Sequence, residues 1–338
     1  MEISSPPADS ISRVRFAPRD DEHLLAAGWD GKIHVYNLAD GQDRKLTTLD
    51  SRDNEEFPIL DATFTRSKAQ ILSTGLSKHL SLWDVNSGSE KKLGQGSWDS
   101  PVSCLEFHQG SNTAFCGSWD GTVRTFDVRL HKEQDTVKCE SKIYCMDQAG
   151  DKILVGMNNK KISVFDVRKM NAPMMVRDSG LRYMLRNVKL MVDGEGFVAS
   201  SVEGRVAWEY FDPSNPEAKP AKYAFKCHRE NLDGKERIHP VNVLAVHPLH
   251  GTFATGGCDG VVSMWDGWAK KRLWRLGPYD TSISSLGFSD GGEKLAVAVS
   301  YTYEGGENRG ASKPKLLVRQ LNDADCMPKN PRKARNLD

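Results

Sequence analysis

Short runs in which apolar and polar residues alternate recur along the chain. Six of them read "ISRVRFAP", "ILDATFTR", "VSCLEFHQ", "KIYCMDQ", "RNVKLMVD" and "VNVLAVHP". Alternation with a period of two is the pattern of a half-buried β-strand. The pattern therefore predicts an all-β chain that is built from repeated units.

A second signature follows each of these runs. A turn of Gly or small residues leads into alternating apolar residues that end in an aromatic residue and Asp or Asn. The copies are "GWDGKIHVYN" (28–37), "GLSKHLSLWD" (75–84), "SWDGTVRTFD" (118–127), "GMNNKKISVFD" (156–166), "SVEGRVAWEYFD" (201–212) and "GCDGVVSMWD" (257–266). They end about 40 to 54 residues apart, close to the period of WD-type propeller blades.

A seventh unit brings the number of predicted blades to seven. It reads "SISSLGFSDGGEKLAVAVS", continues to "PKLLVRQL" at 314–321, and lacks the aromatic–Asp ending. One four-stranded sheet cannot bury both of its apolar faces, whereas seven stacked radially bury them against each other. We therefore predict one domain, a seven-bladed WD-repeat β-propeller over residues 1–322.

The two ends of the chain carry different expectations. Because the ring must close, residues 1–10 are expected to help complete the last blade, with Met1–Ser5 as its outer strand beside "KLLVRQL". Residues 323–338, "DADCMPKNPRKARNLD", are polar, contain proline and are basic. Such a segment is expected to be a disordered basic tail.

Composition and motifs narrow the class of function. Lys plus Arg is 46 and Asp plus Glu is 45, so nucleic acid is an unlikely partner on global charge. No GxxxxGK or HExxH motif is present, and "SDGGEKL" at 289–295 is typical of a hairpin turn ahead of a strand and not of a nucleophile elbow. We therefore expect a protein that is not an enzyme and needs no cofactor or metal.

Compartment and assembly follow from the same inventory. The 7 cysteines are odd in number and form no CxxC pair, which favours a reducing compartment. No apolar run approaches the roughly 20 residues of a membrane helix, so no membrane partner is expected. Nothing in the repeat requires a second copy, and a monomer is expected apart from partners.

Two tryptophans occupy the same position of the turn in different blades. Trp29 in "GWDG" and Trp119 in "GSWDG" precede the turn aspartate, where a side chain points out near the rim of one face. Each could simply stack on a neighbouring loop, because large apolar groups are often partly exposed without function. A peptide-binding platform is the preferred interpretation, because two exposed indoles at one level otherwise leave costly apolar area in water.

At these stretches the sequence resembles the WD-repeat family of the spindle assembly checkpoint, the third of the "budding uninhibited by benzimidazole" proteins. The resemblance rests on "GWDG", "GSWDGTV", "ILVGMNNKKISVFDVR", "SSVEGRVAWEYFDP", "YAFKCHR", "HPVNVLAVHPLHGTFATGGCDG" and "AVSYTYEGG". The related messenger-RNA export factors of the Rae and Gle type share "EGRVA" and "FKCHR". The first-blade "WDG" and the fourth-blade "GMNNKKISVFD" favour the checkpoint family.

The resemblance implies an adaptor. It would bind GLEBS motifs of a checkpoint kinase or pseudokinase, with Trp29 and Trp119 at family positions that contact this peptide. It would also bind phosphorylated MELT motifs of the kinetochore scaffold and recruit checkpoint proteins to unattached kinetochores. Its location would be the nucleus, the kinetochore in mitosis, and also the cytoplasm. The alternatives are an export factor that binds a nucleoporin GLEBS motif and a plain scaffold.

The resemblance also implies a phosphate site. The matching residues are Arg186 in "LRNVKL", Arg205 in "EGRVA" and Lys226 in "AFKCHR". Clustered cations suit phosphothreonine, which carries about −1.5 to −2 charge. From spacing alone, a structural role is favoured instead: Arg205 would pair with a nearby glutamate, and the other two would be solvated charges at strand ends.

Overall fold

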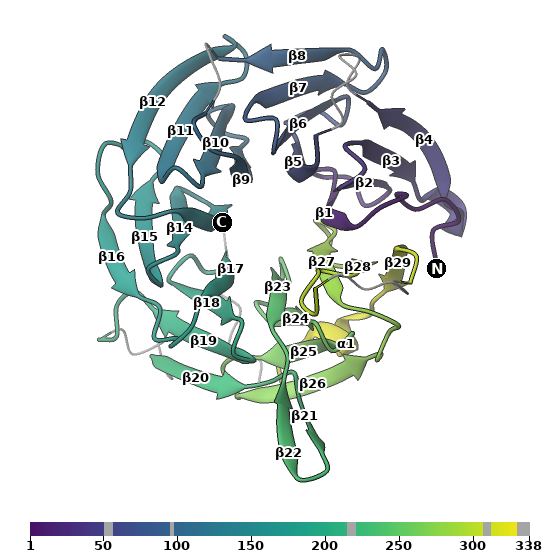
Figure 1. Ribbon diagram of the computed structural model, residues 1–338, viewed down its shortest axis with the longest axis vertical. Coiled ribbons are helices and arrows are strands. Elements are labelled where there is room, and N and C mark those ends of the chain that lie inside the picture. Colours follow the sequence, from purple (N-terminus) through teal and green to yellow (C-terminus); the bar gives the residue numbers. More distant parts are fainter. Residues whose placement is uncertain (51–56, 95–97, 215–220, 307–311, 330–338) are drawn as a thin grey trace.

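The chain folds into a ring of β-sheets arranged around a central channel (Figure 1). This computed structural model describes residues 1–50, 57–94, 98–214, 221–306 and 312–329. Its sheets have four strands each, apart from a three-stranded sheet and a two-stranded hairpin. The predicted all-β, seven-bladed propeller in a single domain is confirmed.

The first four blades follow one another along the chain. Their strands are β1 (Ile11–Phe16), β2 (His23–Gly28), β3 (Ile33–Asn37) and β4 (Arg44–Leu49); β5 (Ile59–Phe64), β6 (Gln70–Gly75), β7 (Leu80–Asp84) and β8 (Glu90–Leu93); β9 (Val102–His108), β10 (Thr113–Ser118), β11 (Thr122–Asp127) and β12 (Lys132–Lys138); β13 (Ile143–Ala149), β14 (Lys152–Met157), β15 (Lys161–Asp166) and β16 (Met175–Asp178). A short 3-10 helix, Ala39–Gly41, precedes β4.

Blades 5 to 7 complete the ring, with a hairpin inserted between blades 5 and 6. Their strands are β17 (Leu185–Leu190), β18 (Gly196–Ser201), β19 (Arg205–Tyr210) and β20 (Lys222–Lys226); β23 (Val241–Val246), β24 (Phe253–Gly257), β25 (Val262–Asp266) and β26 (Lys271–Leu276); β27 (Ile283–Phe288), β28 (Lys294–Val299) and β29 (Lys315–Gln320). The hairpin consists of β21 (Arg229–Leu232) and β22 (Lys235–Ile238), and it projects outward from the ring (Figure 1).

The start of the chain lies along the outer edge of blade 7. Glu2 forms an antiparallel bridge with Leu317 in β29. The amide of Ile3 donates to the Leu316 carbonyl at 2.8 Å, and the Val318 amide donates to the Met1 carbonyl at 2.8 Å. Blade 7 thus takes three strands from the end of the propeller sequence and its outermost backbone from the beginning, which ties the two ends of the ring together.

Apolar cores lie at the seams between blades. Seven clusters of buried side chains occur, and each draws its members from two neighbouring blades. The cluster between blades 7 and 1, for example, joins Ile3 and Leu24 to Leu316. The alternation seen in the sequence is therefore explained, because each sheet is covered on both faces by its neighbours.

The segment after the propeller corrects one expectation. Disorder was expected from Asp323 onward, but residues 323–326 form helix α1 (Asp323–Cys326), and Cys326 is buried. The Cys326 carbonyl accepts a hydrogen bond from Thr252 Oγ1 at 2.7 Å, and the Lys329 amide donates to Asp266 Oδ2 at 3.0 Å. Polar composition misled here because backbone groups and one apolar side chain anchor the segment. Residues 330–338, with "PRKAR", lie outside the described residues.

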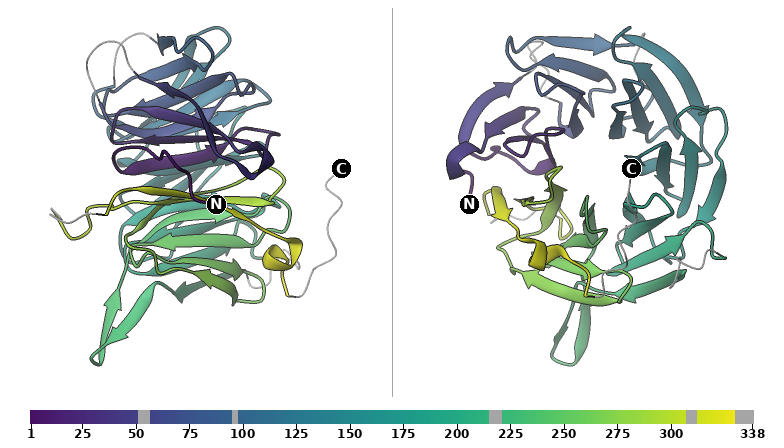
Figure 2. Two further views of the ribbon diagram at one scale, coloured as in Figure 1. Left: turned by 90° about the vertical axis from the view of Figure 1, so that its right-hand side faces the viewer. Right: turned by 180° about the vertical axis from the view of Figure 1, so that it is seen from behind.

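The two faces of the disc carry different parts of each blade (Figure 2). At one face the inner strands begin, and the turns between the second and third strands of every blade lie at the same level. We call it the entry face. The opposite face carries α1, and the turns between the first and second strands lie there. Trp29 and Trp119 follow β2 and β10, which places both on the entry face.

His247, on the opposite face, makes the fold sensitive to acid. Its Nδ1 accepts from the amides of Leu249 and His250, and its Nε2 lies 3.2 Å from the Gly292 carbonyl. This pattern requires the neutral ring, with the proton on Nε2. Burial, and then the charge of His250, lowers the pKa of His247 to about 4 from the ordinary 6.5.

Stability should therefore fall as His247 takes up a proton. A depressed histidine pKa means that the unfolded chain binds more protons, so this contribution is complete above about pH 6.5 and is lost toward pH 4. Between pH 7 and pH 4.5, the free energy of unfolding of the His247→Gln variant is expected to fall by about 1–3 kcal/mol less than that of the wild type. Urea unfolding at both pH values measures this, with exposed His131→Gln as the control. Identical losses in the wild type and the His247 variant would contradict the prediction.

Candidate functional site

The entry-face mouth of the channel is a hollow of about 410 Å³. Each inner strand begins with a register shift against its neighbour, in which one extra residue bulges out. Bulges re-aim a side chain away from the regular sheet. Each blade supplies its bulge residue to the wall of the hollow, and the seven are Ser12, Leu60, Ser103, Tyr144, Arg186, Asn242 and Ser284.

Arg186 and Trp119 meet at this hollow. Both line it, and Arg186 is the only cation among the seven bulge residues. Arg186 Nη2 donates to Asn242 Oδ1 at 3.1 Å, while its Nε is buried without a hydrogen-bond partner among the described residues. Arg186 thus lies in the wall of a hollow, with only part of its hydrogen-bonding capacity satisfied. The sequence spacing had favoured a solvated charge at the end of a strand.

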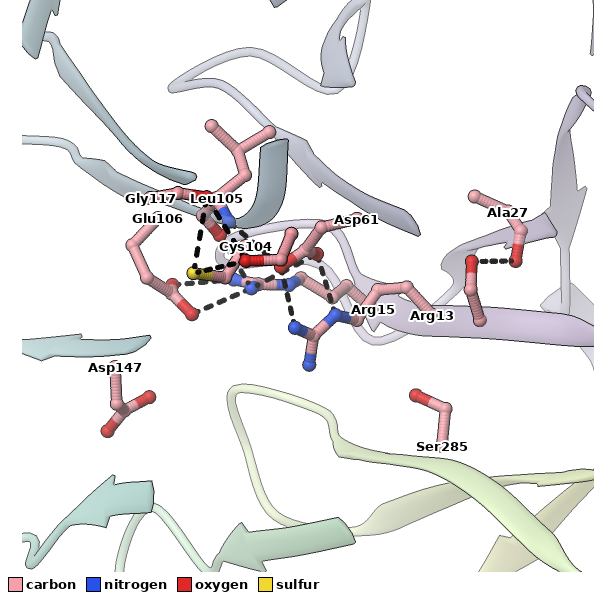
Figure 3. Close-up of polar contacts among 12 residues, drawn as sticks. Arg13, Arg15, Ala27, Asp61, Cys104, Leu105, Glu106, Gly117, Asp147 and Ser285 are labelled. Carbon is pink, nitrogen blue, oxygen red and sulfur yellow. Dashed lines mark hydrogen bonds and ion pairs between the residues drawn. The ribbon is translucent and has the colours of Figure 1, made fainter. Parts of the chain in front are cut away.

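A network of buried charges lies along the channel (Figure 3). Asp61 of blade 2 is fully buried and accepts bonds of 2.6 Å from both Nε and Nη2 of Arg13 in blade 1. Its Oδ2 also accepts from the Leu105 amide of blade 3 at 2.9 Å. Burial pushes the pKa of Asp61 upward, but the charges of Arg13 and Arg15 outweigh this and hold the pKa below its usual value.

The same network continues around the ring. Arg15 donates to both carboxylate oxygens of Glu106 at 2.8 Å, and Lys189 Nζ lies 2.5 Å from Asp147 Oδ1. Burial raises the pKa of Asp147 in spite of Lys189. These pairs bridge the inner strands of blades 1 and 3 and of blades 4 and 5. They therefore connect inner strands that also carry the bulge residues of the hollow.

Trp29 stands at the turn of blade 1 that corresponds to the turn of Trp119. Both backbone amides are held in the same way, with Trp29 donating to the Ser10 carbonyl at 2.9 Å and Trp119 to the Pro101 carbonyl at 3.0 Å. The Trp29 side chain is 44% exposed. Its ring centroid lies 6.4 Å from that of Tyr303, which is 55% exposed and has a φ of 58°. The neighbouring-loop contact that was considered for Trp29 is present, yet both rings remain open to solvent.

Arg205 and Lys226 are direct cross-strand neighbours on β19 and β20. Arg205 Nε lies 3.6 Å from Glu203 Oε2, and Lys226 Nζ lies 3.6 Å from Glu236 Oε1. At this separation, the ion pairs are loose and the donors stay accessible. The pairing of Arg205 with a nearby glutamate, which was considered from the sequence, is therefore present with Glu203. Its separation is too long for a close hydrogen-bonded ion pair.

Cys227 and His228, beside this pair, have structural roles. His228 Nδ1 faces Asp259 Oδ1 at 2.8 Å, its Nε2 faces Thr255 Oγ1 at 2.7 Å, and Trp265 Nε1 donates to the same hydroxyl at 3.0 Å. Cys227 is buried, and burial raises the pKa of its thiol. Its sulfur is therefore held as a thiol, away from the role of a nucleophile.

Sequence reasoning missed two residues of this face. Tyr303, in "YTYEGG", extends the aromatic surface of Trp29, and Arg229, in "FKCHR", adds a third cation beside Arg205 and Lys226. Tyr303 carries no signal of its own, because nothing in a loop sequence shows which blade the loop will meet. Arg229 could have been found from its position within the quoted motif.

Comparison with known proteins bears on this arrangement. The model of the WD domain, G-beta repeat, matches residues 90–127 and 227–266. The mitotic checkpoint protein bub-3 of Caenorhabditis elegans is 40% identical over 97% of this chain and 95% of its own length. The chain belongs to the Bub3 family of mitotic checkpoint proteins. The family resemblance inferred from the motifs is thereby confirmed.

This Bub3-family chain is also similar to a plant checkpoint protein, to an export factor and to a solved propeller structure. Mitotic checkpoint protein BUB3.1 of Arabidopsis thaliana is 38% identical, covering 97% of this chain and 94% of its own. The mRNA export factor GLE2 of Chaetomium thermophilum is 29% identical, covering 97% and 92%. The solved structure of U3-55K superposes with a TM-score of 0.80 at 18% identity, covering 95% and 98%, and shows a shared fold.

The described residues also bear on metal sites and membrane spans. No group of three or more His, Cys, Asp or Glu among them is placed to hold a metal ion. No helix in this part of the chain is long and apolar enough to cross a membrane.

Proposed function

We propose that this chain is a spindle assembly checkpoint adaptor whose entry face binds two kinds of peptide. One is the GLEBS motif of a checkpoint kinase or pseudokinase, and the other is the phosphorylated MELT motif of the kinetochore scaffold. The observation that carries the proposal is that exposed or half-exposed tryptophans and loosely paired cations gather on the same face of the propeller.

The aromatic residues suit the GLEBS peptide. Trp29 and Trp119 stand at equivalent turns whose backbones are held by hydrogen bonds. Rigid indoles supply large contact area at a low cost in ordering entropy, which favours capture of an otherwise disordered segment. Arg186, in the hollow beside Trp119, adds a cation for an acidic side chain or a phosphate.

The cations suit phosphothreonine. Arg205 and Lys226 lie opposite each other on neighbouring strands. The ion pairs of Arg205 with Glu203 and of Lys226 with Glu236 are both loose, with separations of 3.6 Å. A phosphate that carries about −1.5 to −2 charge and three acceptor oxygens would engage both donors more strongly than a single carboxylate does.

Binding of both peptides makes the chain a recruiter. Phosphorylation of the scaffold creates the docking site, and the propeller brings its GLEBS-bearing partner to unattached kinetochores. The protein acts as a monomer between its partners, in the nucleus, at the mitotic kinetochore and in the cytoplasm. This assignment rests on membership of the Bub3 family.

Fluorescence anisotropy of a MELT peptide, with and without phosphothreonine, tests the proposal. The wild type should bind the phosphorylated form alone, and Arg205→Ala should weaken binding about 10- to 150-fold, the value of one or two charge-assisted hydrogen bonds. Arg168→Ala is the matched control, because Arg168 pairs with Asp151 and Asp166 on the opposite face. Binding should also weaken at higher salt.

Equal binding of the two peptide forms, or no binding, would overturn the phosphate site. Weight would then move to the export-factor alternative, which the GLE2 relative supports at lower identity. Salt-dependent binding of RNA, measured in the same format, would favour that alternative.

A further inference from the structure

Residues of the hairpin β21–β22 contact the cations and the β18–β19 turn of blade 5. It projects from the ring beside β20 (Figure 1), and its register pairs Arg229 with Ile238 and Asn231 with Glu236. Residues directly opposite each other in a hairpin share a face, as do residues two apart. Arg229 and Glu236 therefore lie on one face of the hairpin, and Glu230 lies on the other.

Glu236 bridges two cations. Its Oε2 accepts from Arg229 Nη1 at 2.7 Å, and its Oε1 lies 3.6 Å from Lys226 Nζ. Its side chain is 48% exposed and Lys226 is exposed as well. A carboxylate thus occupies, in the free protein, the space between cations where an incoming anion would bind.

Arg229 is held independently of this carboxylate. Its Nη2 donates to the Glu203 carbonyl at 2.7 Å, and its Nε donates to the Gly204 carbonyl at 3.3 Å. These bonds to the β18–β19 turn fix the guanidinium, which is mostly buried. If Glu236 swings away, Arg229 keeps its place and Nη1 becomes free to donate to another anion.

We propose that Glu236 is a built-in competitor for the phosphate, held by Arg229 and Lys226 until a phosphorylated segment displaces it. Arg205, Lys226 and Arg229 carry three positive charges, and Glu203 and Glu236 carry two negative ones. The cluster is therefore nearly neutral while Glu236 is in place. Any incoming anion must first displace Glu236, and this requirement weakens the binding of every anion. A doubly charged phosphate with three acceptor oxygens binds the cations more strongly than Glu236 does and displaces it. A peptide carboxylate has the same charge as Glu236 and gains no such advantage. The proposal rests on the proposed phosphopeptide function.

The test compares Glu236→Gln with Glu230→Gln. The two glutamates belong to the same hairpin and have similar exposure, 48% and 45%, but Glu230 pairs with Arg237 and His239 on the other face. Glu236→Gln should bind the phosphorylated MELT peptide about 3- to 10-fold more tightly, as expected for removing one like charge near a partly exposed anion site. A peptide with Glu in place of the threonine should also gain, and Glu230→Gln should match the wild type.

Unchanged or weaker binding by Glu236→Gln would overturn the proposal, as would an equal gain in Glu230→Gln. A second experiment distinguishes failure of the Glu236 proposal from failure of the proposed phosphopeptide function. It titrates inorganic phosphate at constant ionic strength and follows the amide NMR shifts of Gly204 and Arg205. If the wild type binds neither peptide but Glu236→Gln binds inorganic phosphate more tightly than the wild type, the peptide function fails and the role of Glu236 holds. If the two proteins bind inorganic phosphate equally, the role of Glu236 fails.

Discussion

Replacing Asp61 by alanine is expected to lower the free energy of unfolding by about 3–5 kcal/mol, the usual result of breaking a buried ion pair from one side. Asp61 is fully buried and accepts bonds from Arg13 and from the Leu105 amide, so it joins the inner strands of blades 1, 2 and 3. Its removal leaves the Arg13 charge and a backbone donor without their partner. Since folded proteins are stable by about 5–15 kcal/mol, the loss is a large part of the total.

Urea unfolding followed by tryptophan fluorescence measures this effect. Asp50→Ala is the control, because Asp50 forms an exposed ion pair with Lys32 at 2.9 Å and its loss should cost no more than about 1 kcal/mol. A loss from Asp61→Ala as small as that of the control would show that the channel charges contribute little to holding the blades.

The blades could be predicted because their signals are local. Period-two alternation, Gly turns and the aromatic–Asp ending occur within about forty residues, and neighbouring blades repeat them. The channel network could not be predicted. Asp61 looks like a polar residue in "ILDATF", and its partners Arg13 and Leu105 come from other blades. Such contacts depend on where the ring places each strand.

The end of the chain was harder for the same reason. The composition of "DADCMPK" indicates disorder, but Cys326 is buried and Trp274 Nε1 donates to the Asp325 carbonyl at 2.7 Å. A short polar segment can be ordered by the surface on which it lies, and its own sequence carries little of that information.

The candidate site was predicted in part. The sequence shows that Trp29 and Trp119 occupy equivalent turns, and β19–β20 pairing brings Arg205 opposite Lys226. The bulge that aims Arg186 into the channel mouth, the Tyr303 contact and the bridge made by Glu236 depend on register and on loops between blades.

Replacing Trp119 by alanine is expected to weaken binding of a GLEBS peptide at least 30-fold, which corresponds to about 2 kcal/mol or more for a central aromatic anchor. Trp119 lines the hollow at the channel mouth together with Arg186, so a bound segment would cover its indole and exclude water from the cation. Trp29, which is more exposed and lies beside Tyr303, should give a smaller loss when changed to alanine.

The control for this experiment is Leu130→Ala. Leu130 is 70% exposed in the turn after β11, on the opposite face, so its removal takes away apolar surface without touching the entry face. Isothermal titration calorimetry should show wild-type affinity for this variant, and thermal melts should show that all three variants fold. An unchanged affinity of Trp119→Ala would mean that the indole only packs against its own loop. Equal losses from Trp119→Ala and Leu130→Ala would place the peptide elsewhere on the propeller.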